Sequence, residues 1–202
     1  CNDPNGFSRF GEEYHLFYQY YPYENKWGPM HWGHCRTKDF INWEELPCAM
    51  APDMEYDGQG CFSGTAVEHE GKHILMYTSV LEKDLEDGTR MVRQTQSIAI
   101  GDGEYYEKVA ENPVITADCL PEGSSPVDFR DPKIWKEDGR FYALIGSKAE
   151  DGSGQLALFT SEDAIHWNYE KMIDQCKNRY GKMWECPDFF ALDGRQVLIV
   201  SP

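Results

Sequence analysis

The segment PKIWKEDGRFYALIGS, residues 132–147, joins two apolar runs through an Asp-Gly turn. Both runs are rich in Ile, Tyr, Phe and Trp, which favour strands, and the turn glycine supplies the positive φ of a tight hairpin. Three other segments follow the same plan: NGFSRFGEEYHLFYQY (5–20), SGTAVEHEGKHILMYTS (63–79) and DFFALDGRQVLIVSP (188–202). The turn glycines are Gly11, Gly71, Gly139 and Gly194. This repeated plan predicts an all-β chain made of antiparallel hairpins.

A second repeated motif follows the first and third hairpins. It reads TKDFINW at residues 37–43 and SEDAIHW at residues 161–167, in each case an Asp-containing turn before an aromatic strand. Hairpins that recur roughly every 55 to 70 residues favour four-stranded sheets arranged radially, as in a β-propeller, with a β-sandwich as the alternative. Residues 1–202 would form one partial propeller domain of about three and a half blades. Residues 82–90 and 117–127 are expected to be exposed loops.

The composition limits the classes of partner. The 202 residues include 41% hydrophobic residues, enough for a packed core, and the formal net charge is -16. Such a surface repels nucleic acid and anionic membranes, so neither is expected as a partner. The 7 cysteines are scattered and include no C-x-x-C pair, which argues against a disulfide framework or a structural zinc site. Reduced thiols and the lack of a long apolar run predict a cytoplasmic protein.

Three acidic residues occupy equivalent places in the repeat. Asp3, Asp131 and Glu185 each lie just before or at the start of a hairpin and next to or near a proline. In a propeller the first strand of each blade lines the central channel, so these carboxylates are expected to converge. Two carboxylates about 5–5.5 Å apart are the apparatus of a retaining glycosidase. For any one Asp-Pro pair the alternative is a plain turn, and for the cluster it is a calcium site, although no EF-hand spacing is present.

Aromatic residues near these acids in the chain suit a sugar site, because flat rings stack on the C–H faces of sugars. The candidates are Trp27, Trp32, Phe62 and Trp184. Ordinary core packing is the alternative for each of them. His31 and His34 flank one of these rings, and in a strand-and-turn context we expect them to be structural rather than metal ligands.

The motifs NDPNG, FYQYYP, WGPMHWGH, FSGT, FRDPK and WECPDFF together resemble the pattern of glycoside hydrolase family 32, the invertase and fructanase group. The resemblance covers residues 2–202 and is strongest to bacterial members that act on sucrose 6-phosphate. It implies a five-bladed β-propeller followed by a β-sandwich, of which this chain would be the N-terminal part. The family usually has an aromatic residue and Met before NDPNG, where this chain has Cys1.

The resemblance also implies residue roles. Asp3 would be the nucleophile, Glu185 the general acid/base and Asp131 the stabiliser of the transition state. Substrate contacts would come from Asn2, Gln19, Trp27, Phe62, Ser63 and Arg130. Arg130 is expected to hold its neighbour Asp131 ionised, and the other acids are expected to hold Glu185 protonated. No cofactor or metal is implied.

Other readings remain open at this level. A five-bladed glycosidase acting on arabinosides or xylosides would also use three acids. A glycan-binding propeller, or an inactive fragment that self-associates through exposed sheet edges, would use none of them for chemistry. Within the fructosidase reading, the sequence leaves open sucrose, its 6-phosphate and fructans as the preferred substrate.

Overall fold

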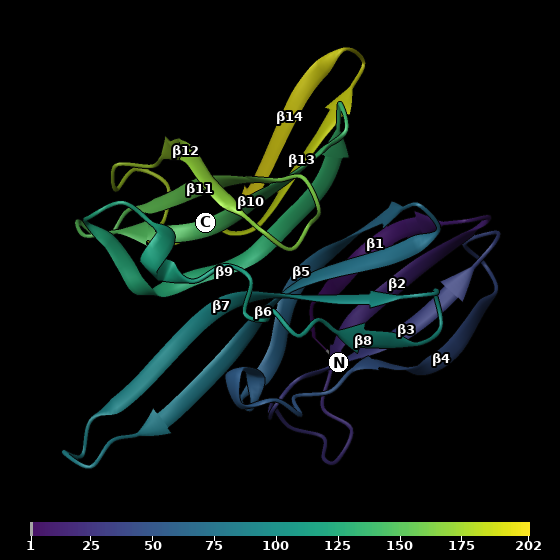
Figure 1. Ribbon diagram of the computed structural model, residues 1–202, viewed down its shortest axis with the longest axis horizontal. Helices are drawn as coiled ribbons and strands as arrows, with labels where there is room; N and C mark the ends of the chain where they lie inside the picture. The colour runs from purple at the N-terminus through teal and green to yellow at the C-terminus, as the bar shows by residue number, and fades with distance from the viewer. Residues whose placement is uncertain (1) are drawn as a thin grey trace.

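The computed structural model describes residues 2–202 and consists of antiparallel β-sheets (Figure 1). The first sheet contains β1 (Pro4–Phe10), β2 (Glu13–Tyr20), β3 (His31–Thr37) and β4 (Trp43–Met50). The second contains β5 (Gly60–His69), β6 (Lys72–Asp84), β7 (Arg90–Gly101) and β8 (Tyr106–Lys108). The third contains β9 (Ser124–Glu137), β10 (Arg140–Ala149), β11 (Gly154–Ser161) and β12 (Asn168–Gln175). The last sheet pairs β13 (Glu185–Leu192) with β14 (Arg195–Ser201), and two single 3-10 turns, η1 (Glu55–Asp57) and η2 (Ala117–Cys119), lie in connections.

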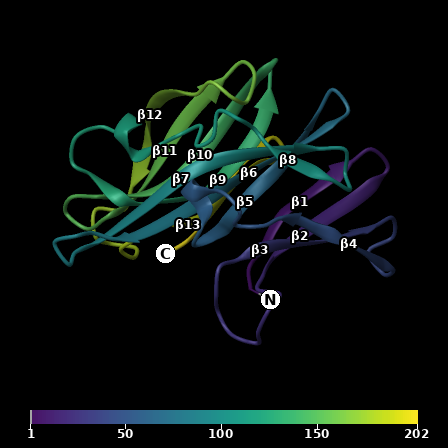
Figure 2. The same cartoon turned by 60° about the horizontal axis from the view of Figure 1, so that its bottom comes forward.

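The sheets stand side by side and meet through their first strands. Within each sheet the strands are hydrogen-bonded in chain order. The first strand of each sheet contacts the first strand of the next, so β1, β5, β9 and β13 form a continuous series (Figures 1 and 2). This confirms the all-β fold and the partial propeller of four-stranded sheets. Closure by a fifth blade stays a prediction.

The four predicted hairpins are present, with their turns at the expected residues. Gly71, Gly139 and Gly194 each have a positive φ, and so does the residue before each of them. Two consecutive positive φ angles match the right-handed twist of the flanking strands. In the first hairpin turn only Gly11, at a φ of 59°, has a positive φ, and the residue before it does not. The turn glycines therefore mark the position of the turn between the first and second strands of each sheet.

The repeated Asp turns have one geometry in both places. An Oδ1 atom of Asp39 accepts hydrogen bonds from the amides two and three residues ahead, and Asp163 does the same. Asp102 makes a third such turn between β7 and β8, with N–H groups of Glu104 and Tyr105. This copy is harder to recognise in the sequence because Ile100 stands where the other two have Thr or Ser, and Tyr106 where they have Trp. Each turn connects the third strand of a sheet to the fourth.

The hydrophobic core lies between neighbouring sheets. One cluster joins the second and third sheets and includes Ile98, Phe129 and Phe141. Another joins the first two sheets around Phe17 and Trp32, and a smaller one packs the last hairpin on the third sheet. Because most of the apolar area lies between sheets, each sheet depends on its neighbours for stability.

Two predicted loops differ from the structure. Residues 82–90 belong mostly to a long hairpin, since β6 continues to Asp84 and β7 starts at Arg90. This hairpin projects from the body of the molecule (Figure 1). The segment 117–127 contains η2 and the first residues of β9. Both segments are rich in polar residues because they are exposed, and exposure does not prevent strand pairing in a hairpin.

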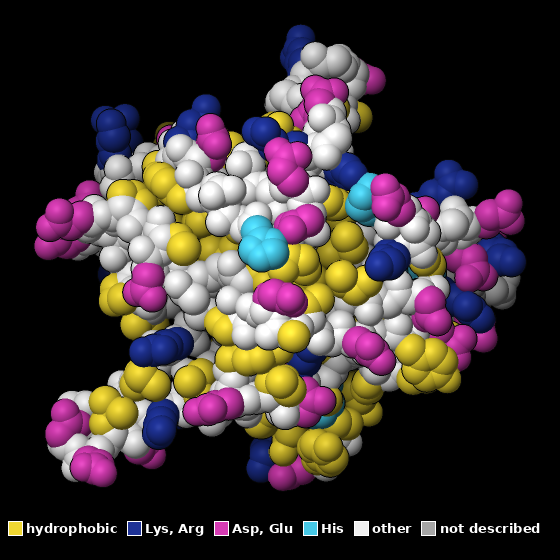
Figure 3. Space-filling view, in the orientation of Figure 1, with side chains coloured by type: hydrophobic (Ala, Val, Ile, Leu, Met, Phe, Trp, Pro, Cys, Tyr) yellow, Lys and Arg dark blue, Asp and Glu magenta, His cyan; other side chains and the backbone are white. Residues whose placement is uncertain are grey.

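The face seen in Figure 3 carries many acidic side chains but no single acidic patch. Figure 3 shows Asp and Glu side chains spread over the whole visible face, with Lys and Arg side chains interspersed. Within residues 2–202 no helix is long and apolar enough to cross a membrane. Six cysteines in this part of the chain are free thiols.

Candidate active site

Asp131 and Glu185 lie on the first strands β9 and β13, Asp3 lies directly before the first strand β1, and each first strand is distorted. The pairing register breaks between Asn5 and Ser8, Cys61 and Gly64, Arg130 and Lys133, and Glu185 and Asp188. Bulges of this kind redirect side chains and are common beside active sites. Asp131 and Cys186 adopt positive φ angles of 63° and 46°, uncommon for residues other than glycine. The repeat therefore places one distortion per sheet around the same region.

Asp3 precedes β1 and is held by polar contacts from two other strands. Ser63 Oγ donates to Asp3 Oδ2 at 3.3 Å, and Gln19 Nε2 donates to Ser63 Oγ at 2.8 Å. The backbone N–H of Gln19 also donates to the carbonyl of Asp3 at 3.0 Å. These contacts leave Oδ1 of an exposed carboxylate free to face a substrate.

Asp131 is the buried acid of the site, with only 7% of its surface exposed. Burial raises the pKa of its carboxyl from 3.8 to about 6. The backbone N–H of Cys186 donates to Asp131 Oδ2 at 3.1 Å, and this contact and the nearby charge of Arg130 lower the pKa by less than burial raises it. Arg130 acts on Asp131 in the expected direction, but desolvation is the larger effect, so the pKa lies above its ordinary value.

Arg130 instead binds Glu185. Its Nε and Nη2 atoms both donate to Glu185 Oε1, at 3.0 and 2.8 Å. The carboxylate is half exposed, while the guanidinium side chain is only 17% exposed. The structure thus places a cation on Glu185, where the sequence predicted only acidic neighbours. Both donors use one oxygen, so Oε2 remains available to a ligand.

Cys186 connects the three acids. Its thiol lies 3.7 Å from Asp131 Oδ2. The surrounding protein raises the pKa of the thiol to about 12, and the negative charges of Asp131 and Asp3 act in the same direction. A thiol that stays protonated is a weak donor rather than a nucleophile. The thiol is thus in contact with Asp131 and within the influence of the Asp3 charge, although these residues are far apart in the sequence.

The aromatic candidates divide into two groups. Trp27 is 60% exposed and packs edge-to-face against Phe62 at 6.0 Å between ring centroids, which leaves a ring face open beside the site. Trp32 and Trp184 are buried in core clusters and are not available to a sugar. Trp27 also lines a cavity of about 380 Å³ together with Asn2 and Gln19. The structure therefore brings together Asn2, Gln19 and Trp27.

The histidines are structural. His31 and His34 lie on a strand, and His34 Nε2 lies 2.9 Å from His15 Nδ1. Burial lowers the pKa of His34 to about 3, so the ring is neutral near pH 7. Within residues 2–202 no group of His, Cys, Asp and Glu side chains has an arrangement suited to a metal ion.

Several residues that support the site were not predicted. Thr78 Oγ1 accepts the N–H of Asp131 at 2.8 Å and donates to Gln96 Oε1 at 3.0 Å. Thr65 of β5 donates to the carbonyl of Pro132 at 2.8 Å. These side chains replace the ladder bonds lost at the bulge of β9. The signal in the sequence was Pro132 itself, because a proline inside a central strand marks a bulge.

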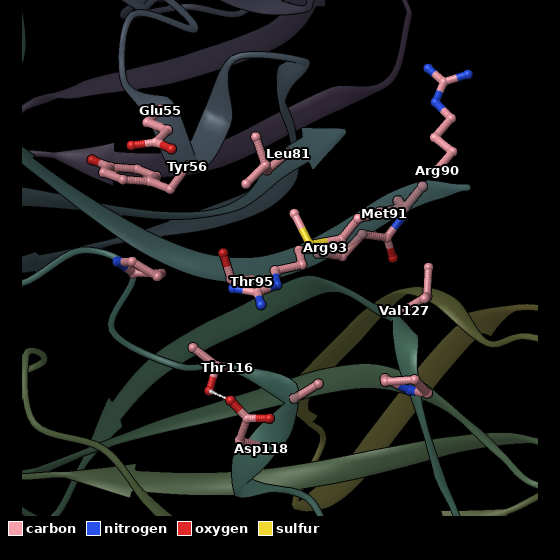
Figure 4. Close-up of a pocket in the computed structure, with 15 residues that line it drawn as sticks. Glu55, Tyr56, Leu81, Arg90, Met91, Arg93, Thr95, Thr116, Asp118 and Val127 are labelled. Carbon is pink, nitrogen blue, oxygen red and sulfur yellow. Dashed lines mark hydrogen bonds between the residues drawn. The ribbon is translucent and has the colours of Figure 1, made fainter. Parts of the chain in front are cut away.

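A groove of about 640 Å³ lies beside the site (Figure 4). Met91 and Arg93 of β7 form one wall, and Thr116 and Asp118 of the connection to β9 lie opposite. Gln94 also lines this groove. Its side-chain carbonyl oxygen accepts a hydrogen bond from Arg130 Nη1 at 3.1 Å. The groove therefore approaches the Arg130–Glu185 pair.

Radial antiparallel sheets with carboxylates converging from their first strands define the class of propeller glycosidases. The whole chain, residues 1–202, matches the family model described as glycosyl hydrolases family 32 N-terminal domain, and the chain belongs to this family. It is 43% identical over 213 residues to a sucrose-6-phosphate hydrolase of Zymomonas mobilis and 38% identical over 202 residues to one of Escherichia coli. These alignments include all of this chain but only 40% and 41% of the relatives' length.

Solved structures agree with this assignment. A variant of the GH32 β-fructofuranosidase of Bombyx mori, in complex with sucrose, matches 100% of this chain and 41% of its own, with a TM-score of 0.87 at 40% identity. The sucrose-6-phosphate hydrolase of Lactobacillus gasseri matches 98% of this chain and 39% of its own, with a TM-score of 0.84 at 37% identity. Membership in the family rests on the whole chain, and the activity of the whole protein is proposed below.

Proposed function

We propose that the protein containing this chain is a retaining β-fructofuranosidase that hydrolyses sucrose, sucrose 6-phosphate or a related β-fructoside. The observation that carries the proposal is the convergence of Asp3, Asp131 and Glu185, each with a different environment. The relatives named as sucrose-6-phosphate hydrolases and the β-fructofuranosidase complex with sucrose support the same substrate class. The reaction needs no cofactor, because two carboxylates supply the proton and the nucleophile.

Glu185 acts as the general acid and base. Arg130 occupies Oε1, so Oε2 delivers the proton to the glycosidic oxygen and later accepts one from water. The guanidinium fixes the direction of the carboxyl plane. Proton transfer of this kind contributes roughly 10²–10⁴-fold to the rate.

Asp131 stabilises the positive charge that develops on the fructosyl ring. The N–H of Cys186 holds Oδ2, and Oδ1 is directed to hydroxyl groups of the sugar. This role requires the ionised carboxylate. Because burial raises its pKa to about 6, Asp131 supplies the charge fully only above that pH.

Asp3 is the nucleophile. Ser63 donates to Oδ2, which leaves Oδ1 to attack the anomeric carbon and form a fructosyl ester. Water activated by Glu185 then cleaves this ester, and two displacements at one carbon retain the configuration. Trp27 and Phe62, with Asn2 and Gln19, provide surface for the sugar rings.

Two wider aspects belong to the same proposal. We infer that residues 1–202 form one partial propeller domain whose remaining blades complete the substrate pocket in the full-length protein. A cytoplasmic location is supported by the free thiols in the described part of the chain, because disulfides are rare in that compartment. Self-association through exposed sheet edges stays a prediction.

The test is kinetic and uses the full-length protein. Asp3→Ala and Glu185→Ala should each lower kcat on sucrose or its 6-phosphate by about 10³-fold or more, with the fold intact by circular dichroism. Glu86→Ala, at the exposed tip of the β6–β7 hairpin, is the matched control and should retain normal kcat. Near-normal turnover by either site variant removes the assigned role. Hydrolysis of arabinosides or xylosides in place of β-fructosides would refute the substrate class.

A further inference from the structure

Arg130 is held by more than its partner Glu185. Its Nη1 atom donates to Gln94 Oε1 at 3.1 Å and to Asp128 Oδ1 at 3.3 Å. Nε and Nη2 are both committed to Glu185. The orientation of the guanidinium is therefore set on one edge by Gln94 and Asp128 and on the other by Glu185.

Gln94 binds the backbone as well as the side chain of this segment. The same Oε1 atom accepts the N–H of Phe129 at 3.2 Å. Two residues further along β7, on the same face of the strand, Gln96 Nε2 donates to the carbonyl of Phe129 at 2.9 Å. The two glutamines thus form hydrogen bonds with both the N–H and the carbonyl of Phe129, the residue before Arg130. At this point the bulge of β9 begins.

The support for Gln94 is rigid. β7 pairs with β6 along twelve consecutive residues, and Gln94 lies opposite Val80 within that run. By contrast, Arg130 is a long side chain at an irregular position of β9, so its free rotation would be large without fixed acceptors. A carbonyl oxygen on a regular strand can hold it in place without adding charge.

We propose that Gln94 is a positioning residue for the hydrolytic reaction, acting through Arg130 to hold the carboxyl plane of Glu185 toward the glycosidic oxygen. This inference rests on the function proposed above. Displacement of a catalytic group by about 1 Å can lower a rate by roughly 10²-fold. Loss of the acceptor should therefore reduce kcat more than it changes KM.

The location of Gln94 makes this testable without disturbing the core. Its side chain lines the groove of Figure 4 and belongs to none of the three hydrophobic clusters. Gln94→Met keeps the length and removes the acceptor. Gln94→Ala removes it and lets water enter from the groove, which provides a second variant if the first does not fold. Gln94→Glu keeps an acceptor oxygen at the same reach.

The experiment measures kcat and KM separately on sucrose and sucrose 6-phosphate for the full-length protein. Gln175→Met, on the outer strand β12, is the matched control. We expect Gln94→Met and Gln94→Ala to lower kcat by about 10–100-fold with little change in KM. Gln94→Glu should recover most of kcat.

The outcomes separate the two proposals. If the wild-type protein hydrolyses β-fructosides but both acceptor-free variants match it and Gln175→Met in kcat, the positioning role is refuted and the proposed function stands. A lowered kcat with an equal change in KM and no recovery by Gln94→Glu also refutes it, because a general packing defect would give that result. If the wild-type protein hydrolyses no β-fructoside, the proposed function itself fails.

Discussion

Asp131→Asn should make the protein more stable than wild type at neutral pH. This advantage should shrink as the pH is lowered. Burial raises the pKa of Asp131 from 3.8 to about 6 in the folded protein, while the unfolded chain retains the ordinary value. A shift of about 2 units corresponds to about 3 kcal/mol at 1.36 kcal/mol per unit. The folded state thus binds this proton more tightly than the unfolded state. That contribution to stability is complete below pH 3.8 and is lost as the pH rises through about 6.

Asparagine has nearly the same shape and carries no charge, so it isolates this effect. The free energy of unfolding is measured by urea denaturation of wild type and Asp131→Asn between about pH 4 and about pH 8. The difference between the variant and the wild type should increase by about 2.4 kcal/mol over this interval in favour of the variant, because the unfolded group is already partly ionised at pH 4. Changes common to both proteins, such as the titration of other carboxyls, cancel. A difference that stays constant, or that decreases with rising pH, would show that Asp131 is not the buried, weakly acidic group described above.

Two other substitutions test buried polar contacts by the same urea measurement. Lys108→Met should destabilise the protein by about 3–5 kcal/mol, because it leaves the fully buried Asp57 without the cation 2.5 Å away, and adding Asp57→Asn should restore part of the loss. No recovery in the double variant would contradict the assignment of the effect to an unpaired charge. Thr78→Val should cost about 1–3 kcal/mol, because it removes the acceptor of the buried N–H of Asp131. Thr78→Ser retains that acceptor, so equal losses in both variants would argue against the hydrogen bond as the cause.

Local patterns in the sequence predict the sheets well. Turn residues have strict backbone requirements, so Gly139 and Gly194 mark hairpins without knowledge of the rest of the chain. The Asp39 and Asp163 turns are equally local, because their hydrogen bonds span two or three residues. Equivalent positions in repeated hairpins then predict that the acids at the first strands converge. The contact of Cys186 with Asp131 and the influence of the Asp3 charge on the pKa of its thiol agree with this.

Long-range pairing could not be read from the sequence in the same way. Arg130 is adjacent to Asp131 in the chain, yet the bulge of β9 directs its guanidinium to Glu185, 55 residues away. The support from Gln94 likewise depends on the register between β7 and β9, which no local pattern encodes. The sequence also does not show which aromatic residues near the acids are exposed. Trp27 is exposed and Trp32 is fully buried, although they are only five positions apart.

The two acids beside Arg130 receive different kinds of partner, and this difference suits the tasks that the proposed function assigns to them. Asp131 must present negative charge to the developing cation of the sugar, and an ion pair directly on its carboxylate would cancel much of that field. A backbone N–H from Cys186 holds it in place with a dipole instead. Glu185 must be aimed as it gains and loses a proton, and a planar guanidinium fixes a carboxyl plane better than any neutral donor. The distortion of β9 makes both arrangements possible, because it turns two consecutive residues, Arg130 and Asp131, toward the same site with different neighbours.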